Sequence, residues 1–245
     1  MKKRLINVIG IAMFILLWQL LSKKTGDVAI VGIDKIFTSL INILKDQKFY
    51  SHLLSTLKIL CIGIGIAVVV GITVGILIDM SELIKGLTTP VIELLRNIPS
   101  ITLFPIILVI FGIGDFSRIF IIFWTATPPV IISTIYGLRN IDKEIINASE
   151  VFGANKLQRM IYIKFPLAML EILNGVKIAI GNGFVAIVVA EMLGASKGLG
   201  YMVLWVTNSF KYNETYAYII IIAVVGFMAN MIMSVIIKEY ERRII

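Results

Sequence analysis

Long apolar stretches alternate with short polar segments along the whole chain. Six of them reach, or nearly reach, the length of about 20 apolar residues that a helix needs to cross a bilayer. They cover residues 5–21, 53–78, 88–111, 119–136, 172–193 and 215–237. This pattern predicts an all-α polytopic membrane protein, with six transmembrane helices in one integral-membrane domain that covers residues 1–245.

The longest polar segment in the second half of the chain covers residues 140–166 and contains two helical patterns that meet at Gly153. Asn140 is placed to cap the first helix, and apolar residues then recur at three- and four-residue spacing. Gly153 fits the left-handed position that ends a helix. Asn155 can cap the second helix, and Gln158 three residues later can complete a capping box. We interpret the segment either as a handle for another protein or as a loop helix on the membrane surface.

A second polar segment, residues 33–45, carries apolar residues on one helical face. Its apolar positions are Ile33, Ile36, Phe37, Leu40, Ile41 and Leu44. This spacing predicts an amphipathic helix that lies on the outer membrane surface or on the helix bundle.

Composition and charge agree with a membrane protein. Charged residues make up 16% of the chain, against roughly 25% in soluble domains, and the mean hydropathy is +0.96. The net charge of +8 does not indicate a nucleic-acid partner, since Lys and Arg lie at span ends and in short loops. They are more numerous in the segments that face inside if both termini are cytoplasmic. The basic and apolar residues 1–21 are interpreted as a first span, with a cleavable signal peptide as the alternative.

Polar residues and prolines interrupt two of the predicted spans. Arg96 and Asn97 directly precede Ile98 and Pro99 in the third, and Asn182 and Glu191 lie in the fifth. Ionisable groups and broken helices inside a membrane are costly, so they are functional candidates by default. We therefore expect Arg96, Asn97, Asn182 and Glu191 to belong to a translocation path or its gate. Hydrogen bonding between helices is the alternative role.

The second predicted span carries glycines at positions 71 and 75. This small-xxx-small pattern is typical of helices that pack closely in membranes, although glycine is common in such helices.

The segment 147–166 reads NASEVFGANKLQRMIYIKFP. It resembles the EAA loop of the permease subunits of bacterial ABC importers, in which three residues separate EAA from a Gly and nine further residues separate that Gly from I-x-L-P. Gly153, Ile163 and Pro166 stand at the corresponding positions, and Phe165 replaces the Leu.

The head of the motif departs from the family pattern. Ala148 matches the middle of EAA, whereas Asn147 replaces the usual Glu, Ser149 replaces the last Ala and Glu150 is out of register. Residues 90–115 and 188–203 also resemble the branch that imports nitrate, sulfonates and taurine, and this similarity runs from about residue 30 to about residue 240 of the sequence.

The resemblance implies a cytoplasmic coupling helix between spans four and five that docks into an ATPase subunit. It implies two such subunits, an extracytoplasmic solute-binding protein and a second permease copy, with the chain surrounded by lipid in a bacterial cytoplasmic membrane. Transport by alternating access would carry a small anion such as a sulfonate, taurine or nitrate, or alternatively a vitamin or pyrimidine precursor. The residues expected at the ATPase contact are Ala148, Glu150, Gly153, Ala154, Asn155, Lys156, Gln158 and Pro166.

Several kinds of site are not expected in this chain. It has no G-x-x-x-x-G-K-[ST] sequence, so ATP and magnesium are expected on the partner ATPase and no cofactor on this chain. GASKGLG at 194–200 lacks that spacing and is interpreted as part of a gate or of the docking surface for a binding protein. One Cys and one His make a metal cluster implausible. An ion-coupled transporter or an intramembrane enzyme remains the alternative, and the chain shows neither the inverted repeat nor the catalytic set that these need.

Overall fold

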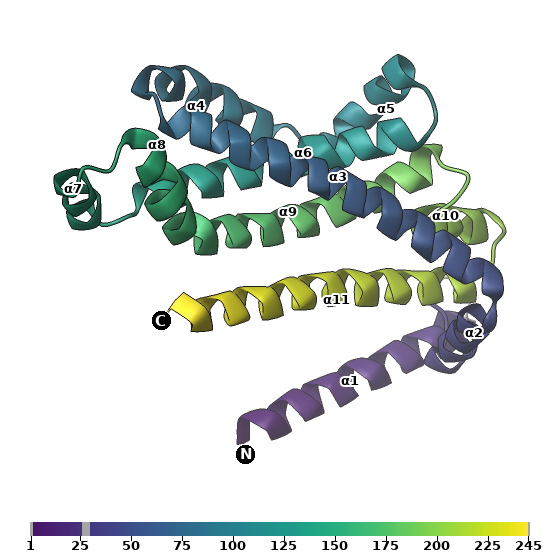
Figure 1. The fold of residues 1–245 in the computed structure, drawn as a ribbon. Coiled ribbons are helices and arrows are strands. Elements are labelled where there is room, and N and C mark those ends of the chain that lie inside the picture. Colours follow the sequence, from purple (N-terminus) through teal and green to yellow (C-terminus); the bar gives the residue numbers. More distant parts are fainter. Residues whose placement is uncertain (1, 26–29, 245) are drawn as a thin grey trace.

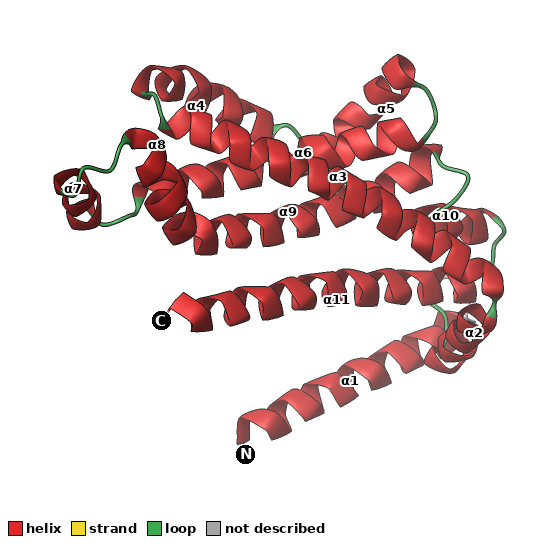
Figure 2. Ribbon diagram, viewed as in Figure 1, coloured by secondary structure: helices red, strands yellow, loops and turns green. Residues whose placement is uncertain are grey.

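The computed structural model describes residues 2–25 and 30–244, except for the side chains of residues 2–9, 11, 12, 14, 25, 89, 95, 96, 243 and 244. Within these ranges all regular structure is helical (Figure 2). The elements are α1 (Lys2–Thr25), α2 (Ile33–Lys45), α3 (Gln47–Asp79), α4 (Glu82–Asn97), α5 (Ser100–Phe111), α6 (Asp115–Arg139), α7 (Lys143–Val151), α8 (Lys156–Arg159), a π-turn η1 (Met160–Lys164), α9 (Phe165–Gly194), α10 (Leu199–Asn208) and α11 (Tyr212–Ile244).

Four helical segments of the described chain are long and apolar enough to cross a membrane. They are Gln47–Asp79, Asp115–Arg139, Lys156–Gly194 and Tyr212–Arg242, and they contain the second, fourth, fifth and sixth predicted spans. The predicted first span lies within α1, where many side chains are outside the described residues. A count of six spans is therefore not confirmed.

The predicted third span, 88–111, is two helices rather than one. α4 ends at Asn97, and α5 begins at Ser100. Pro99 has no N–H to continue the helix and disfavours helical backbone at Ile98. The break therefore follows directly from the local sequence.

Helices α3, α6 and α9 pack together as the centre of the bundle (Figure 1). Gly71 and Gly75 of α3 face α6, and a Cβ atom added at either would lie 2.7 Å from the Cβ of Val130 or Thr134. Glycine at these positions lets the two backbones approach, so the small-xxx-small pattern does mark the α3–α6 contact.

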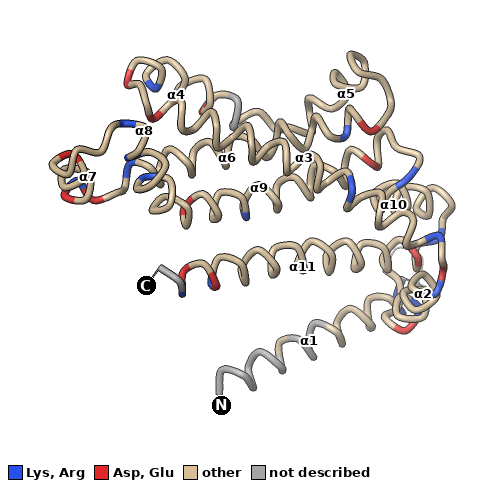
Figure 3. Tube along the Cα trace, in the orientation of Figure 1, with Lys and Arg blue, Asp and Glu red and all other residues tan. Residues whose placement is uncertain are grey.

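The two ends of the bundle are distinct. The start of α1 and the end of α11 lie at the same end as α7 and α8, which we call the α7–α8 end (Figure 1). The opposite end, the α2–α10 end, carries α2, α10 and the first turns of α3 and α11. Charged residues gather at these two ends and are sparse between them (Figure 3). This distribution suits a bundle whose middle lies in hydrocarbon.

Helix α2 covers the range that its periodicity predicts, and it packs on the bundle. Ile36 and Ile43 are buried in a core that includes Leu199 of α10 and Tyr218 of α11. One side of α2 therefore lies against the bundle, while Ile33, Phe37, Ile41 and Leu44 are exposed.

Candidate functional sites at the two ends of the bundle

Helix α7 begins two residues later than its sequence suggests. Its N-cap is Asp142, whose carboxylate accepts a hydrogen bond of 2.9 Å from the Glu144 amide. Asn140 instead ends α6, since its own amide donates to Tyr136 O. The predicted cap at Asn140 was therefore wrong, because the preceding helix already uses this residue.

Helix α7 ends as predicted at Gly153, which has φ +81°. The Gly153 amide donates to Glu150 O at 2.9 Å and the Ala154 amide to Ser149 O at 3.0 Å. These two bonds form a Schellman motif, which satisfies carbonyls that the helix itself leaves open. A residue with a Cβ atom would be strained at this backbone angle.

Helix α8 carries the predicted capping box. The Asn155 side chain accepts from the Gln158 amide at 2.8 Å, and the Gln158 side chain accepts from the Asn155 amide at 2.9 Å. Arg159 of α8 forms an ion pair with Glu150 of α7. The two short helices are thus held at a defined angle by bonds within the loop.

The surface of this loop is unusually apolar. Val151 is 87% exposed, Phe152 89%, Leu157 64% and Tyr162 75%. Most of the predicted contact residues, from Ala148 to Gln158, are also exposed on the loop, while Ala154 is half-buried. Pro166 lies at the start of α9, and its carbonyl accepts from Tyr240 Oη at 3.2 Å. Apolar groups gathered on an exposed loop are typical of a surface that binds another protein or the membrane.

Salt bridges tie the base of the loop to two other helices. Asp79, at the end of α3 and 5% exposed in its side chain, lies 2.7 Å from Lys164 Nζ and 3.4 Å from Arg139 Nε. Arg139 also reaches Glu82 at 3.3 Å. Asp79 was not predicted from the sequence, although a carboxylate directly after a long apolar stretch is a signal that could have found it.

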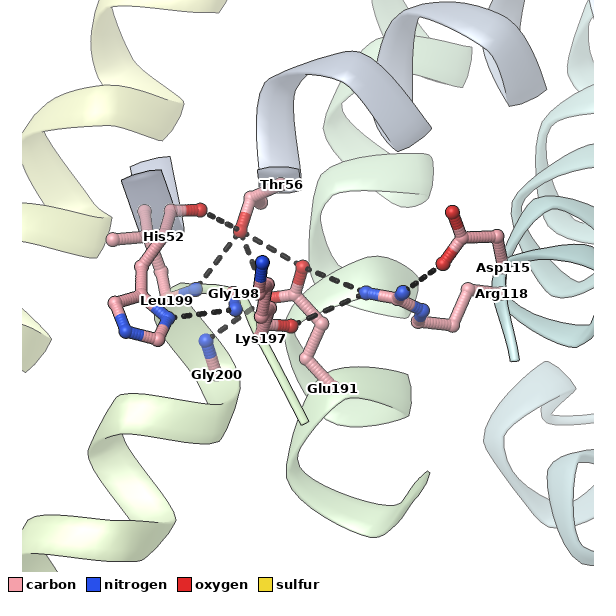
Figure 4. A network of polar contacts seen from close by, with 9 residues as sticks. All are labelled: His52, Thr56, Asp115, Arg118, Glu191, Lys197, Gly198, Leu199 and Gly200. Atoms are coloured by element: carbon pink, nitrogen blue, oxygen red, sulfur yellow. Dashed lines mark hydrogen bonds and ion pairs between the residues drawn. The ribbon is translucent and has the colours of Figure 1, made fainter. Parts of the chain in front are cut away.

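At the α2–α10 end, Glu191 is the centre of a buried network (Figure 4). Its carboxylate is 0% exposed and accepts from Thr56 Oγ1 at 2.8 and 2.9 Å and from the Gly200 amide at 2.9 Å. Thr56 Oγ1 in turn accepts from the Leu199 amide at 2.9 Å. Glu191 of α9 is therefore joined to α3 and to the start of α10.

Arg118 of α6 closes the other side of this network. Its guanidinium lies 3.8 Å from Glu191, donates to Lys197 O at 3.2 Å and pairs with Asp115. Gly198 has φ +128°, and a Cβ atom there would lie 2.1 Å from Glu191 Cδ. The network thus holds the turn after α9 against the carboxylate, and neither Thr56 nor Arg118 was predicted from the sequence.

Asn182 lines a cavity of about 240 Å³ beside the α4–α5 break, which we call the α6–α9 cavity. Its other lining residues are Ser100, Trp124, Thr125, Pro128, Pro129, Ile132, Ser133 and Ile178. Asn97 is exposed at the end of α4 and does not line this cavity. The side chain of Arg96 lies outside the described residues. The structure therefore does not gather the four predicted path residues into one site.

Within residues 2–25 and 30–244, no group of three His, Cys, Asp or Glu side chains is placed to hold a metal ion.

Comparison with known proteins gives concordant matches. Residues 67–245 match the family model described as binding-protein-dependent transport system inner membrane component. The taurine transport system permease protein TauC of Escherichia coli is 32% identical over 186 residues, which are 76% of this chain and 68% of TauC. The nitrate import permease protein NrtB of Synechocystis is 30% identical over 230 residues, 91% of this chain and 84% of NrtB.

Solved structures give the same fold. A chain of the MetNI methionine ABC transporter in an inward-facing conformation aligns with a TM-score of 0.71 at 18% identity. The alignment covers 79% of this chain and 96% of the MetNI chain. The family match covers well over half of the sequence, and the relatives are permease subunits of ABC transporters. The chain therefore belongs to the binding-protein-dependent transport system inner membrane components, as a multi-pass permease subunit of an ABC importer.

Proposed function

We propose that this permease works by alternating access, driven by an ATPase subunit that binds the α7–α8 loop. The observation that carries the proposal is the loop itself. Two short helices are fixed to each other by a Schellman motif, a capping box and an ion pair, yet they expose Val151, Phe152 and Leu157. A connecting loop in water gains nothing from exposing these apolar side chains unless a partner protein or the membrane surface covers them.

Movement of the loop would pass directly into the bundle. α8 runs through the π-turn into α9 without an intervening loop. Lys164 in that turn is bound to Asp79 at the end of α3, and Asp79 also faces Arg139 at the end of α6. A push on α8 would therefore act on all three central helices. A partner changes the equilibrium between two states only when it binds them unequally, so the ATPase must contact the loop differently in each.

A second copy of the chain would complete the path for the solute. The α6–α9 cavity lies beside the helix break at 98–99 and is lined by hydroxyl and amide groups, including Asn182. This cavity would become a closed passage if a second copy packed against its opening. The ATPase end would be the α7–α8 end, on the cytoplasmic side of a bacterial inner membrane, and a solute-binding protein would deliver cargo at the α2–α10 end.

The relatives suggest the substrate class. TauC and NrtB are named for taurine and nitrate, so a small anion such as a sulfonate, taurine or nitrate is the first candidate. A vitamin or pyrimidine precursor is the second, because Trp124 lines the same cavity and aromatic rings can stack on planar heterocycles. ATP would be hydrolysed by the partner subunit alone.

The test is to separate assembly from coupling in nanodiscs that contain the permease, its ATPase and its binding protein. Replacing Phe152 by Ser removes an exposed apolar side chain without altering the backbone. If the Phe152 side chain is buried against the ATPase, the affinity between permease and ATPase should fall by roughly tenfold or more, since burying a Phe side chain is worth about 1.5–3 kcal/mol. ATP hydrolysis stimulated by loaded binding protein should fall with it.

Backbone geometry gives an independent variant with a matched control. Gly153→Val places a β-branched residue at a left-handed backbone position in the loop. Gly112→Val does the same at the C-terminal end of α5, where φ is +78°, and a Cβ atom would meet no neighbour within 4 Å at either position. Only Gly153→Val should abolish ATPase binding or stimulated hydrolysis. If both Phe152→Ser and Gly153→Val retain normal ATPase binding and coupled transport, the loop is not the ATPase contact.

A further inference from the structure

A pocket of about 640 Å³ opens at the α2–α10 end, away from the α6–α9 cavity. Its walls come from α2, the first turns of α3 and α11, the turn after α9, and α10. The lining residues are Ser39, Asn42, Ile43, Asp46, Lys48, Phe49, His52, Ser196, Lys197, Tyr201, Met202, Trp205, Lys211, Asn213, Glu214 and Tyr218. We call it the α2–α10 pocket. It shares no lining residue with the α6–α9 cavity, so it is a separate feature of the chain.

The pocket carries uncompensated positive charge. Three lysines line it, against two carboxylates, Asp46 and Glu214. Glu214 pairs with Lys211 at 3.3 Å, and the Asp46 carboxylate accepts from the Lys48 amide as the N-cap of α3. Among residues whose side chains are described, no ion pair engages the ammonium group of Lys48 or of Lys197. Among these residues, Lys48 and Lys197 are therefore without an ion pair, and with the charge of Asp46 included the pocket lining keeps a net charge of +1.

The pocket lining combines these polar groups with apolar and aromatic side chains. Ile43, Phe49 and Tyr218 are buried residues of the lining. The His52 and Tyr201 rings stack with centroids 5.9 Å apart, and Lys211 lies 5.5 Å from the centre of the Trp205 ring. A concave site with an apolar body and a few convergent charges is the usual form of a small-molecule site.

The wall that carries Lys197 is held in place before any ligand arrives. The Gly198 amide donates to His52 Nδ1 at 3.2 Å, and the Lys197 carbonyl accepts from Arg118 (Figure 4). Behind them, the buried Glu191 carboxylate fixes the start of α10 through the Gly200 amide. A site whose wall is already ordered loses less entropy when it binds a ligand.

From this combination we propose that the α2–α10 pocket binds a small organic anion. The carboxylate, sulfonate or phosphate group of the ligand lies between Lys48 and Lys197, and its apolar part rests on Ile43 and Phe49. The phosphate of a lipid headgroup has the same chemistry and is the second source of such an anion. The proposal concerns a site outside the translocation path and does not rest on transport by the chain.

The three tryptophans allow the two cavities to be monitored separately. Trp205 lines the α2–α10 pocket, Trp124 lines the α6–α9 cavity and Trp18 lines neither. Two single-tryptophan variants are made with Phe at the other two positions, one keeping Trp205 and one keeping Trp124. Each permease is placed in phosphatidylcholine nanodiscs and titrated with butanesulfonate, and with the uncharged butanesulfonamide in parallel.

A bound anion should change Trp205 emission in a saturable way, and butanesulfonamide should not. Lys197→Gln and Lys48→Gln should each weaken binding roughly two- to fivefold, the range for one solvent-accessible charge pair. Lys45→Gln, at the exposed end of α2 and outside the lining, should leave the affinity unchanged.

Lipid composition distinguishes the two sources of the anion. If a lipid headgroup occupies the pocket, nanodiscs containing phosphatidylglycerol should show a shifted Trp205 emission before any butanesulfonate is added, and a higher butanesulfonate concentration should be required for half-saturation. If the site takes a free solute, the titration should match the one in phosphatidylcholine. Either result supports an anion site. The proposal is overturned if Trp205 shows no saturable response in either lipid, if the sulfonamide acts equally, or if Lys45→Gln weakens binding as much as Lys197→Gln does.

Discussion

The Thr56 hydroxyl is the group through which α3 holds both Glu191 and the start of α10. Thr56 is fully buried, donates to the Glu191 carboxylate and accepts from the Leu199 amide at 2.9 Å. Replacing it with Val keeps nearly the same volume and β-branching, so the change removes hydrogen bonds without opening a cavity. The variant therefore measures how much the network contributes to the stability of the bundle.

The cost of Thr56→Val can be worked out from the two bonds that it removes. The Leu199 amide would be buried without an acceptor, which costs about 1–3 kcal/mol. Glu191 would lose a hydrogen-bond donor, and bonds to a charged group contribute about 1.5–3 kcal/mol. Since neighbouring groups relax, we expect the free energy of unfolding to fall by about 3–5 kcal/mol.

The assay is unfolding of the purified permease in mixed micelles by increasing SDS, with the free energy taken from the transition. Thr73→Val is the matched control, because Thr73 is exposed on the same helix and its hydroxyl bonds only to Val69 O. The control should change stability by no more than about 0.5 kcal/mol. Equal losses for Thr56→Val and Thr73→Val would show that the buried network does not stabilise the bundle.

Three further changes test other parts of the structure. Asn155→Ala removes the N-cap of α8 and should destabilise that helix by about 1 kcal/mol. The measurement is amide hydrogen exchange in residues 156–159, which should become faster; unchanged exchange would contradict the capping role. Asp79→Asn leaves both Lys164 and Arg139 facing a neutral group, so it should cost about 1–3 kcal/mol. It should cost more than Lys164→Met, after which Asp79 still faces Arg139; the opposite order in SDS unfolding would refute the arrangement. Gly75→Leu forces a side chain against α6 and should lower the free energy of unfolding by more than about 3 kcal/mol. Gly65→Leu is the control, because a Cβ atom there meets open space and the change should be tolerated. Similar unfolding curves for the two variants would contradict the close α3–α6 packing.

Local features of this protein could be read from its sequence. Gly153, Asn155 and Gln158 are confirmed in their structural roles because each acts on residues no more than four positions away. The break before Pro99 is likewise local, since it needs only a missing N–H and a steric clash with the preceding residue. The error at Asn140 also has a local cause. Asn140 and Asp142 lie two positions apart, and the spacing of apolar residues alone did not show that α6 would end at Asn140.

Contacts between distant segments needed the tertiary structure. Thr56 and Glu191 are 135 positions apart, and Lys164 is 85 positions from Asp79. Hydropathy placed these residues at the ends of apolar stretches, but the rotation of each helix decides which polar groups meet. Packing also decided that α2 lies on the bundle, because its apolar face would suit a membrane surface equally well. The sequence by itself thus determined the helices, the loop motif and the family, whereas the pairing of buried polar groups depended on how the helices pack.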